Sequence, residues 1–154
     1  VIDLQRTSAF AVSNRLNTNP TTYPDYVSDT TNEGTTSAAS YLTRPVVLDN
    51  TSTSLDIRLT ANVRTSSNIL VYFRTSAADE VRDINDISWT PFNSDGSEDT
   101  TVIPAEDDFT FREYKYSASN LNGFEAFQIK IVMTGTISSY PPKIRDMRGI
   151  ALAV

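Results

Sequence analysis

The stretch that decides the fold runs from Phe124 to Val154 and reads FEAFQIKIVMTGTISSYPPKIRDMRGIALAV. Its first half has apolar residues at every second position, and this period of two places them on one face of a β-strand. The apolar positions are Phe127, Ile129, Ile131 and Met133. We predict that they face the core, and that a second strand follows the Pro-Pro break and pairs with the first.

Further strand signals precede this stretch. From Leu55 to Val63 apolar and polar residues alternate, which predicts a strand with one wet face. The higher apolar density from Asn68 to Thr75 indicates a central strand covered on both faces. Strands are also predicted from Tyr41 to Leu48 and from Phe109 to Ser117, whereas the acidic residues 76–108 are expected to form loops and short strands.

These signals together predict an all-β protein. No amphipathic helix longer than two turns is expected, so we predict an antiparallel β-sandwich or jelly roll over residues 41–154. Residues 1–40 are rich in Thr, Ser and Asn and are interrupted by Pro20 and Pro24, which indicates an extended or partly ordered arm. The arm carries a few apolar side chains, so we expect it to dock on a neighbouring subunit; a disordered tail is the alternative.

The composition excludes several classes of partner. The chain has 154 residues and a net charge of −6, which opposes binding to nucleic acid or to an anionic membrane. It contains no Cys and no apolar run long enough to span a bilayer. It does not start with Met, which is compatible with a segment of a longer protein.

The absence of histidine bears on catalysis. Without His, the usual general base near neutral pH, the Ser-His-Asp and Cys-His arrangements and the commonest transition-metal ligand are missing. A carboxylate pair remains possible among 19 acidic residues, but spacing singles out no pair. We therefore predict a protein that is not an enzyme.

Aromatic side chains suggest one candidate binding site. Sugars stack their apolar faces on aromatic rings and hydrogen-bond to nearby polar groups. The candidates for carbohydrate binding are Trp89, Tyr72, Tyr114 and Tyr116, with Tyr140 as a further ring. The alternative, which we favour for the lone tryptophan, is that Trp89 anchors the core.

An acidic loop suggests a second candidate site. The segment NSDGSED offers oxygen ligands and a glycine for a tight turn, and calcium takes six to eight such ligands. The candidate ligands are Asn93, Asp95, Glu98 and Asp99, with Glu106, Asp107 and Asp108 shortly after them. The spacing departs from the EF-hand pattern. A solvated acidic loop is the favoured alternative, and no other cofactor is expected.

Four segments resemble a known family. They are Ala9 to Asn17 (AFAVSNRLN), Tyr41 to Val63 (YLTRPVVLDNTSTSLDIRLTANV), Ile69 to Ser76 (ILVYFRTS) and Phe127 to Ala153 (FQIKIVMTGTISSYPPKIRDMRGIALA). Together they resemble the C-terminal region of virion structural proteins from marine T4-like myoviruses, especially cyanophages. The last segment is also similar to the end of galactose-binding, discoidin-like jelly rolls.

The resemblance implies a structural role in the tail, baseplate or fibre of a virion. It implies other virion subunits as partners, a homo-oligomer with a trimer favoured, and no catalytic residues to carry over. Surface adhesion is an added expectation. The alternative function is a carbohydrate-binding module that recognises glycans on the host surface.

Overall fold

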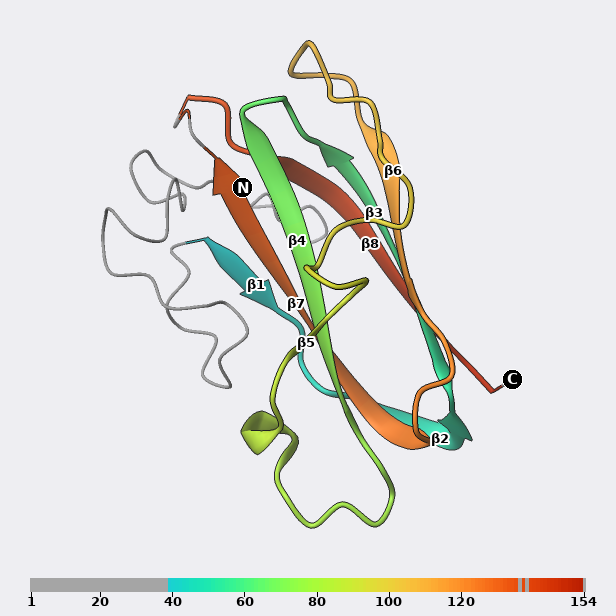
Figure 1. Ribbon diagram of the computed structural model, residues 1–154. Helices are drawn as coiled ribbons and strands as arrows, with labels where there is room; N and C mark the ends of the chain where they lie inside the picture. Colours follow the sequence, from blue (N-terminus) through green and yellow to red (C-terminus); the bar gives the residue numbers. More distant parts are fainter. Residues whose placement is uncertain (1–38, 136, 138, 154) are drawn as a thin grey trace, which may run out of the picture.

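Two antiparallel sheets face each other in the part of the chain that the computed structural model describes, residues 39–135, 137 and 139–153 (Figure 1). The predicted class, an all-β antiparallel sandwich, is confirmed. The predicted arm, apart from its last two residues, lies outside the described residues.

The first sheet, sheet A, contains five strands. Its strands are β1 (Ser40–Leu42), β2 (Val46–Ser52), β4 (Ser67–Ser76), β5 (Thr90–Pro91) and β7 (Phe124–Gly135). The order is β1-β7-β4-β5, and β2 continues the edge of β1 along β7. β4 and β7 pair along nearly their whole length, from Ser67 opposite Gly135 to Ser76 opposite Ala126.

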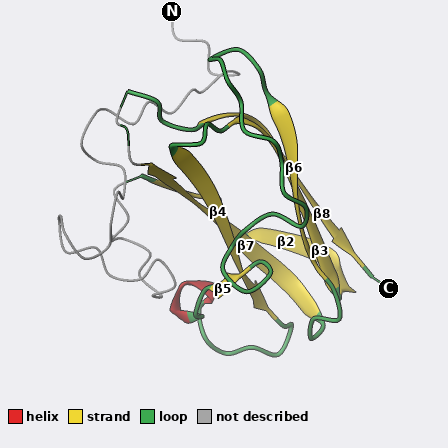
Figure 2. Ribbon diagram, turned by 45° about the horizontal axis from the view of Figure 1, so that its top comes forward, coloured by secondary structure: helices red, strands yellow, loops and turns green. Residues whose placement is uncertain are grey.

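The second sheet, sheet B, contains three strands. They are β3 (Ser54–Asn62), β6 (Arg112–Ala118) and β8 (Lys143–Leu152), in the order β6-β3-β8. A 3₁₀ turn, η1 (Ile84–Asp86), follows β4 and contacts sheet A (Figure 2).

The core lies between the inner faces of the two sheets. Sheet A contributes Phe127, Ile129, Ile131 and Met133, so the core face predicted for β7 is confirmed. β4 adds Ile69, Val71 and Phe73, and sheet B adds Leu55, Ile57, Leu59, Ala61, Tyr114 and Tyr116. Burial of this apolar surface is the main force that holds the two sheets together.

Gly149 lets β8 approach sheet A closely. A Cβ atom at this position would lie 3.2 Å from Ile57 Cδ1 and within 3.9 Å of the ring of Phe127. The second strand of the closing stretch therefore needs a small residue where Phe127 crosses the gap between the sheets.

The predicted pairing of the two closing strands is wrong. β7 belongs to sheet A, whereas β8 pairs with β3 in sheet B. The loop that contains Pro141 and Pro142 therefore crosses from one sheet to the other. Alternation of side chains identifies a strand, but it does not identify the neighbouring strand.

Two predicted strand boundaries are also corrected. The segment from Tyr41 to Leu48 splits into β1 and β2, because Pro45 has no N–H to donate to a strand partner. Between the two strands, the N–H of Thr43 donates to the carbonyl of Ile129 (3.0 Å), and the Thr43 hydroxyl oxygen accepts from the N–H of Ile129 (3.0 Å). β6 begins three residues later than predicted, and Phe109 lies in the preceding loop with 86% of its surface exposed.

The outer face of sheet A carries a buried arginine. Arg74 donates hydrogen bonds to Gln128 Oε1 (2.8 and 2.5 Å), to the carbonyl and side-chain oxygens of Asn85 (both 2.7 Å) and to the carbonyl of Ile87 (3.3 Å). Gln128 in turn donates to the carbonyl of Thr43 (2.6 Å). The network ties η1, β4, β7 and the β1–β2 link together.

The charge of Arg74 is stabilised where it is buried. Burial lowers the pKa of Arg74, and the carboxylates of Asp83 and Asp86 act in the opposite direction. An arginine retains its charge at neutral pH. Its hydrogen bonds therefore offset the cost of removing a cation from water.

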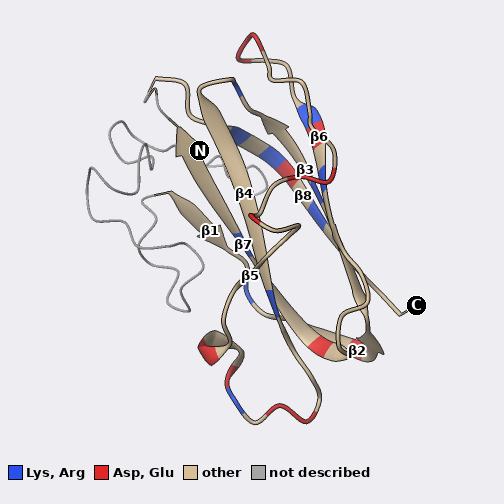
Figure 3. Ribbon diagram, viewed as in Figure 1, with Lys and Arg blue, Asp and Glu red and all other residues tan. Residues whose placement is uncertain are grey.

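The strands of sheet B carry charged residues of both signs (Figure 3). The register places Lys115, Arg58 and Arg148 in one row across the three strands. Asp56 lies 3.6 Å from Arg58 Nε and 3.5 Å from Lys115 Nζ, and Glu113 lies 3.1 Å from Arg58 Nη1 and 3.6 Å from Arg148 Nη2. The outer face of sheet B is therefore a neutralised, hydrated surface.

The core position of Ile131 is tested by Ile131→Asp. Only 1% of Ile131 is exposed, and an unpaired carboxylate there has an energetic cost comparable with the whole stability of a domain, about 5–15 kcal/mol. We expect the variant to be unfolded by circular dichroism, whereas Val47→Asp, at a position 79% exposed, stays folded. A soluble Ile131→Asp variant with a cooperative melting transition would contradict this assignment.

The Arg74 network is tested by Arg74→Ala. The change leaves Gln128 and the carbonyl of Asn85 without their donor, and we expect it to lower the free energy of unfolding by on the order of 3 kcal/mol. The matched control is Arg148→Ala, which removes only surface ion pairs and should cost less than about 1 kcal/mol. Urea denaturation of both variants provides the comparison, and equal losses would refute a special role for Arg74.

Candidate functional site at the loop end

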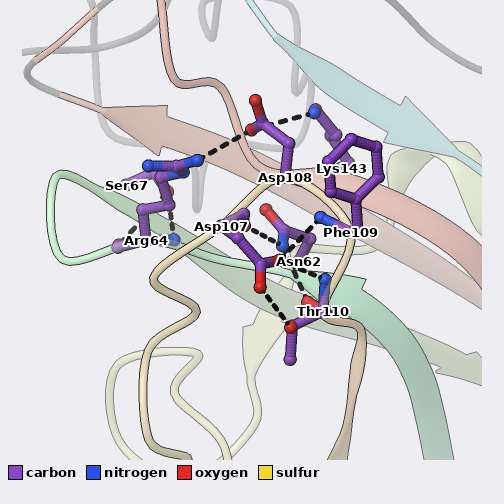
Figure 4. Close-up of polar contacts among 8 residues, drawn as sticks. All are labelled: Asn62, Arg64, Ser67, Asp107, Asp108, Phe109, Thr110 and Lys143. Carbon is purple, nitrogen blue, oxygen red and sulfur yellow. Dashed lines mark hydrogen bonds and ion pairs between the residues drawn. The ribbon is translucent and has the colours of Figure 1, made fainter.

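Three chain segments meet at one end of the sandwich: residues 62–67, residues 103–110 and residues 139–143, here called the loop end (Figure 4). The first segment is a tight turn between β3 and β4. Its turn is closed by hydrogen bonds from the N–H of Ser67 to the carbonyl of Arg64 (2.9 Å) and from the N–H of Arg64 to the Ser67 hydroxyl oxygen (3.0 Å).

Asn62 attaches the second segment to the sandwich. It is buried at the end of β3, and its amide donates to the carbonyls of Asp107 (2.8 Å) and Thr110 (2.7 Å). The loop is thus held by a side chain whose own position is fixed by strand pairing.

Asp107 shapes the loop locally. Its carboxylate accepts hydrogen bonds from the N–H groups of Phe109 (2.8 Å) and Thr110 (2.6 Å) and from the Thr110 hydroxyl (2.8 Å). These bonds, first of all the one from the Phe109 N–H, lower the pKa of Asp107 because they favour its charged form.

Asp108 joins all three segments. Its Oδ1 atom lies 3.1 Å from Arg64 Nη2 and 3.1 Å from Lys143 Nζ (Figure 4). The hydrogen bond from Lys143, followed by that from Arg64, lowers the pKa of Asp108. One carboxylate thus links the β3–β4 turn to the start of β8.

A hollow of about 440 Å³ lies beside this ion pair. Its walls include Arg64, Thr65, Ser66, Ile103, Glu106 and Tyr140. The guanidinium carbon of Arg64 lies 4.4 Å from the centre of the Tyr140 ring, a cation–π contact. Tyr140 is 40% exposed, so the wall presents an aromatic ring together with hydroxyl and carboxylate groups.

The aromatic residues predicted to bind carbohydrate do not form one surface. Tyr114 and Tyr116 point into the core, and the centre of the Tyr116 ring lies 6.1 Å from that of Phe92. Burial raises the pKa of both tyrosines. A ring inside the core has no face for a sugar, so the prediction is corrected for these two residues.

Trp89 and Tyr72 are buried on the outer face of sheet A, the face that turns away from sheet B. With Val132 they form a small second apolar cluster, and the guanidinium carbon of Arg74 lies 4.3 Å from the Trp89 ring centre. The fully buried Lys130 approaches the same two rings, at 5.3 Å from Tyr72 and 5.6 Å from Trp89. The favoured alternative, an anchoring role for Trp89, agrees with its burial, although it anchors the outer face rather than the main core.

The residues predicted to bind calcium make hydrogen bonds that stabilise loops. Asp99 accepts from the N–H (2.9 Å) and hydroxyl (2.6 Å) of Ser117, Asp95 accepts from the N–H of Ser97 (2.9 Å), and Asn93 donates to the Ser97 carbonyl (2.7 Å). Glu98 accepts a longer bond from Val102 N–H (3.4 Å). Among the described residues, no three acidic side chains gather as metal ligands.

The loop end contains residues that the sequence analysis did not connect. Tyr140 was considered as an aromatic ring and Asp108 as an acidic residue, but nothing related them to Arg64 or Lys143. These four residues lie on three separate segments of the chain and share no motif spacing. The pairing of β3 with both β6 and β8 brings the ends of these segments together.

No family model and no curated protein matches the sequence. In the described ranges, no helix is both long and apolar enough to cross a membrane.

Three solved structures are similar to this chain. The enzymatically active domain of tailspike protein 4 from bacteriophage CBA120 has a TM-score of 0.42 and 12% identity, over 73% of this chain and 14% of that chain. A structure of the infectious bursal disease virus Gt strain has a TM-score of 0.44 and 7% identity, over 74% of this chain and 26% of that chain. The CBM22-1 xylan-binding domain of Paenibacillus barcinonensis Xyn10C has a TM-score of 0.37 and 6% identity, over 71% of this chain and 60% of that chain.

This chain spans less than two thirds of each of those three chains. All three TM-scores lie below 0.5, so these similarities do not indicate a function for this chain.

The role of Asp107 is tested by titration. Its pKa is depressed below the ordinary 3.8, so its stabilising bonds are complete above that pH and are lost as the pH falls through the folded-state pKa. We expect the amide resonances of Phe109 and Thr110 to shift with a midpoint below 3.8 in NMR spectra. Asp107→Asn should abolish this transition, and an unchanged transition in that variant would assign it to another group.

Proposed function

We propose that this chain is a non-enzymatic structural module of a bacteriophage virion, joined to other subunits through an exposed edge of sheet A. The observation that carries the proposal is the apolar character of that edge. The exposed side chains there are Tyr41, Leu42, Val46 and Val47.

The edge has the properties of an assembly surface. β1 and β2 each pair with β7, and neither has a second strand partner within the described residues. Edge strands of proteins that stay monomeric usually carry charges or are covered, because open backbone groups otherwise attract another chain. Here Val47 is 79% exposed, so the edge offers both unpaired backbone and apolar side chains to a partner.

The assignment to a virion has a separate basis. It rests on the resemblance of four segments to virion structural proteins of T4-like myoviruses. The predicted arm, residues 1–40, leads directly into β1, so a subunit at this edge would also lie near the end of the arm. Docking of the arm on such a subunit, and a trimeric arrangement, belong to the proposal.

Carbohydrate binding is the second candidate function. The exposed ring of Tyr140 in the wall of the hollow favours it. The two functions are compatible, because the hollow lies at the loop end and the apolar edge lies along β1 and β2.

The assembly edge is tested by Val47→Asp. A carboxylate there disfavours burial of the edge, so we expect the wild-type chain to form an oligomer and the variant to be a monomer in light scattering after size exclusion. The matched control is Val81→Asp, on a loop at a position 96% exposed, which should leave the oligomer unchanged.

Two results would contradict the proposal. A wild-type chain that is monomeric at all concentrations would argue against self-assembly through this edge. Absence of the protein from gradient-purified particles, analysed by mass spectrometry, would argue against a virion component.

A further inference from the structure

We propose that the hollow at the loop end binds a neutral pyranose ring of a surface polysaccharide, with Tyr140 as the stacking platform. The proposal rests on the second candidate function above and assigns its site and its class of ligand. It does not depend on the assembly edge.

The ring of Tyr140 is positioned for stacking. One side of it is covered by the Arg64 guanidinium at 4.4 Å, while the residue keeps 40% of its surface exposed and forms part of the wall of the hollow. The apolar face of a sugar ring packs on such a surface. The neighbouring Ile103 extends the apolar wall.

The platform is also held in place before a ligand binds. Arg64, which supports the ring, is paired with Asp108, and Asp108 is paired with Lys143 at the start of β8. Fixing the contact residue in advance reduces the entropy lost on binding. Tyr140 is therefore a better platform than an exposed tyrosine with no neighbour, such as one on a free loop.

Charge in the hollow favours a neutral sugar. Arg64 and Lys143 share Asp108, at 3.1 Å each, and Asp107 and Glu106 bring the nearby carboxylates to three against two cations, so an acidic sugar gains little attraction. Glu106 in the wall adds a negative charge that repels uronic and sialic acids. Glu106 and the hydroxyl of Thr65 provide polar groups that hydrogen-bond to sugar hydroxyls.

The experiment is affinity electrophoresis of the full chain in native gels that contain galactomannan, β-glucan or alginate. The first two polysaccharides are neutral and the third is a polyuronate. We expect at least one neutral polysaccharide to retard the wild-type chain and alginate to have no effect. Tyr140→Ala should weaken the retardation by about tenfold or more, because it removes the central contact.

The matched control is Val81→Ala, which shortens an apolar side chain that is 96% exposed on a loop outside both the hollow and the assembly edge, and it should keep the wild-type retardation. Circular dichroism confirms that both variants are folded. No retardation in any gel, stronger retardation by alginate, or undiminished binding by Tyr140→Ala would overturn the proposal. None of these results changes the mass of the oligomer, so failure of the sugar site is distinguishable from failure of the assembly edge.

Discussion

The pairing of β4 with β7 is the constraint on which the rest of the structure depends. These two strands lie in the middle of sheet A, and both of their faces are buried. The inner faces form half of the core, and the outer faces must be covered by something other than sheet B. The segment 77–89 provides part of that cover through Trp89, and Arg74 binds η1 and the following residues to the sheet. A polar network therefore stabilises a face that apolar packing only partly covers.

The sequence predicts the strands better than it predicts their arrangement. Alternation identified the core face of β7, because side-chain direction in a strand depends only on position along that strand. The partner of β8 depends on where a distant segment lies, so pairing with β7 was a natural but wrong expectation. The direction of Tyr114 and Tyr116 shows the same limit, since alternation gives two faces without saying which one meets the core.

The candidate site was harder to predict for a related reason. Asn62, Asp108 and Lys143 belong to three segments that are distant in the sequence and are brought together by the pairing of β3 with β6 and β8 in sheet B. The acidic loop looked like a cation site because its residue types suit calcium. The structure uses the same carboxylates to accept backbone and hydroxyl hydrogen bonds, as Asp99 does from Ser117, and such bonds leave no sign in the composition.

The surfaces that can bind partners are those whose exposed groups are not already paired within the chain. The charges on the outer face of sheet B neutralise one another, because Asp56 and Glu113 form ion pairs with the row of cations that contains Arg58. An ion-paired face of this kind loses little by staying in water and gains little by binding. The β1–β2 edge and the loop end differ, because each exposes apolar side chains beside polar groups. At the loop end the charged residues mainly position the Tyr140 ring: Arg64 contacts the ring, and Asp108 forms an ion pair with Arg64. Specificity there depends on which sugar fits a fixed ring beside Glu106.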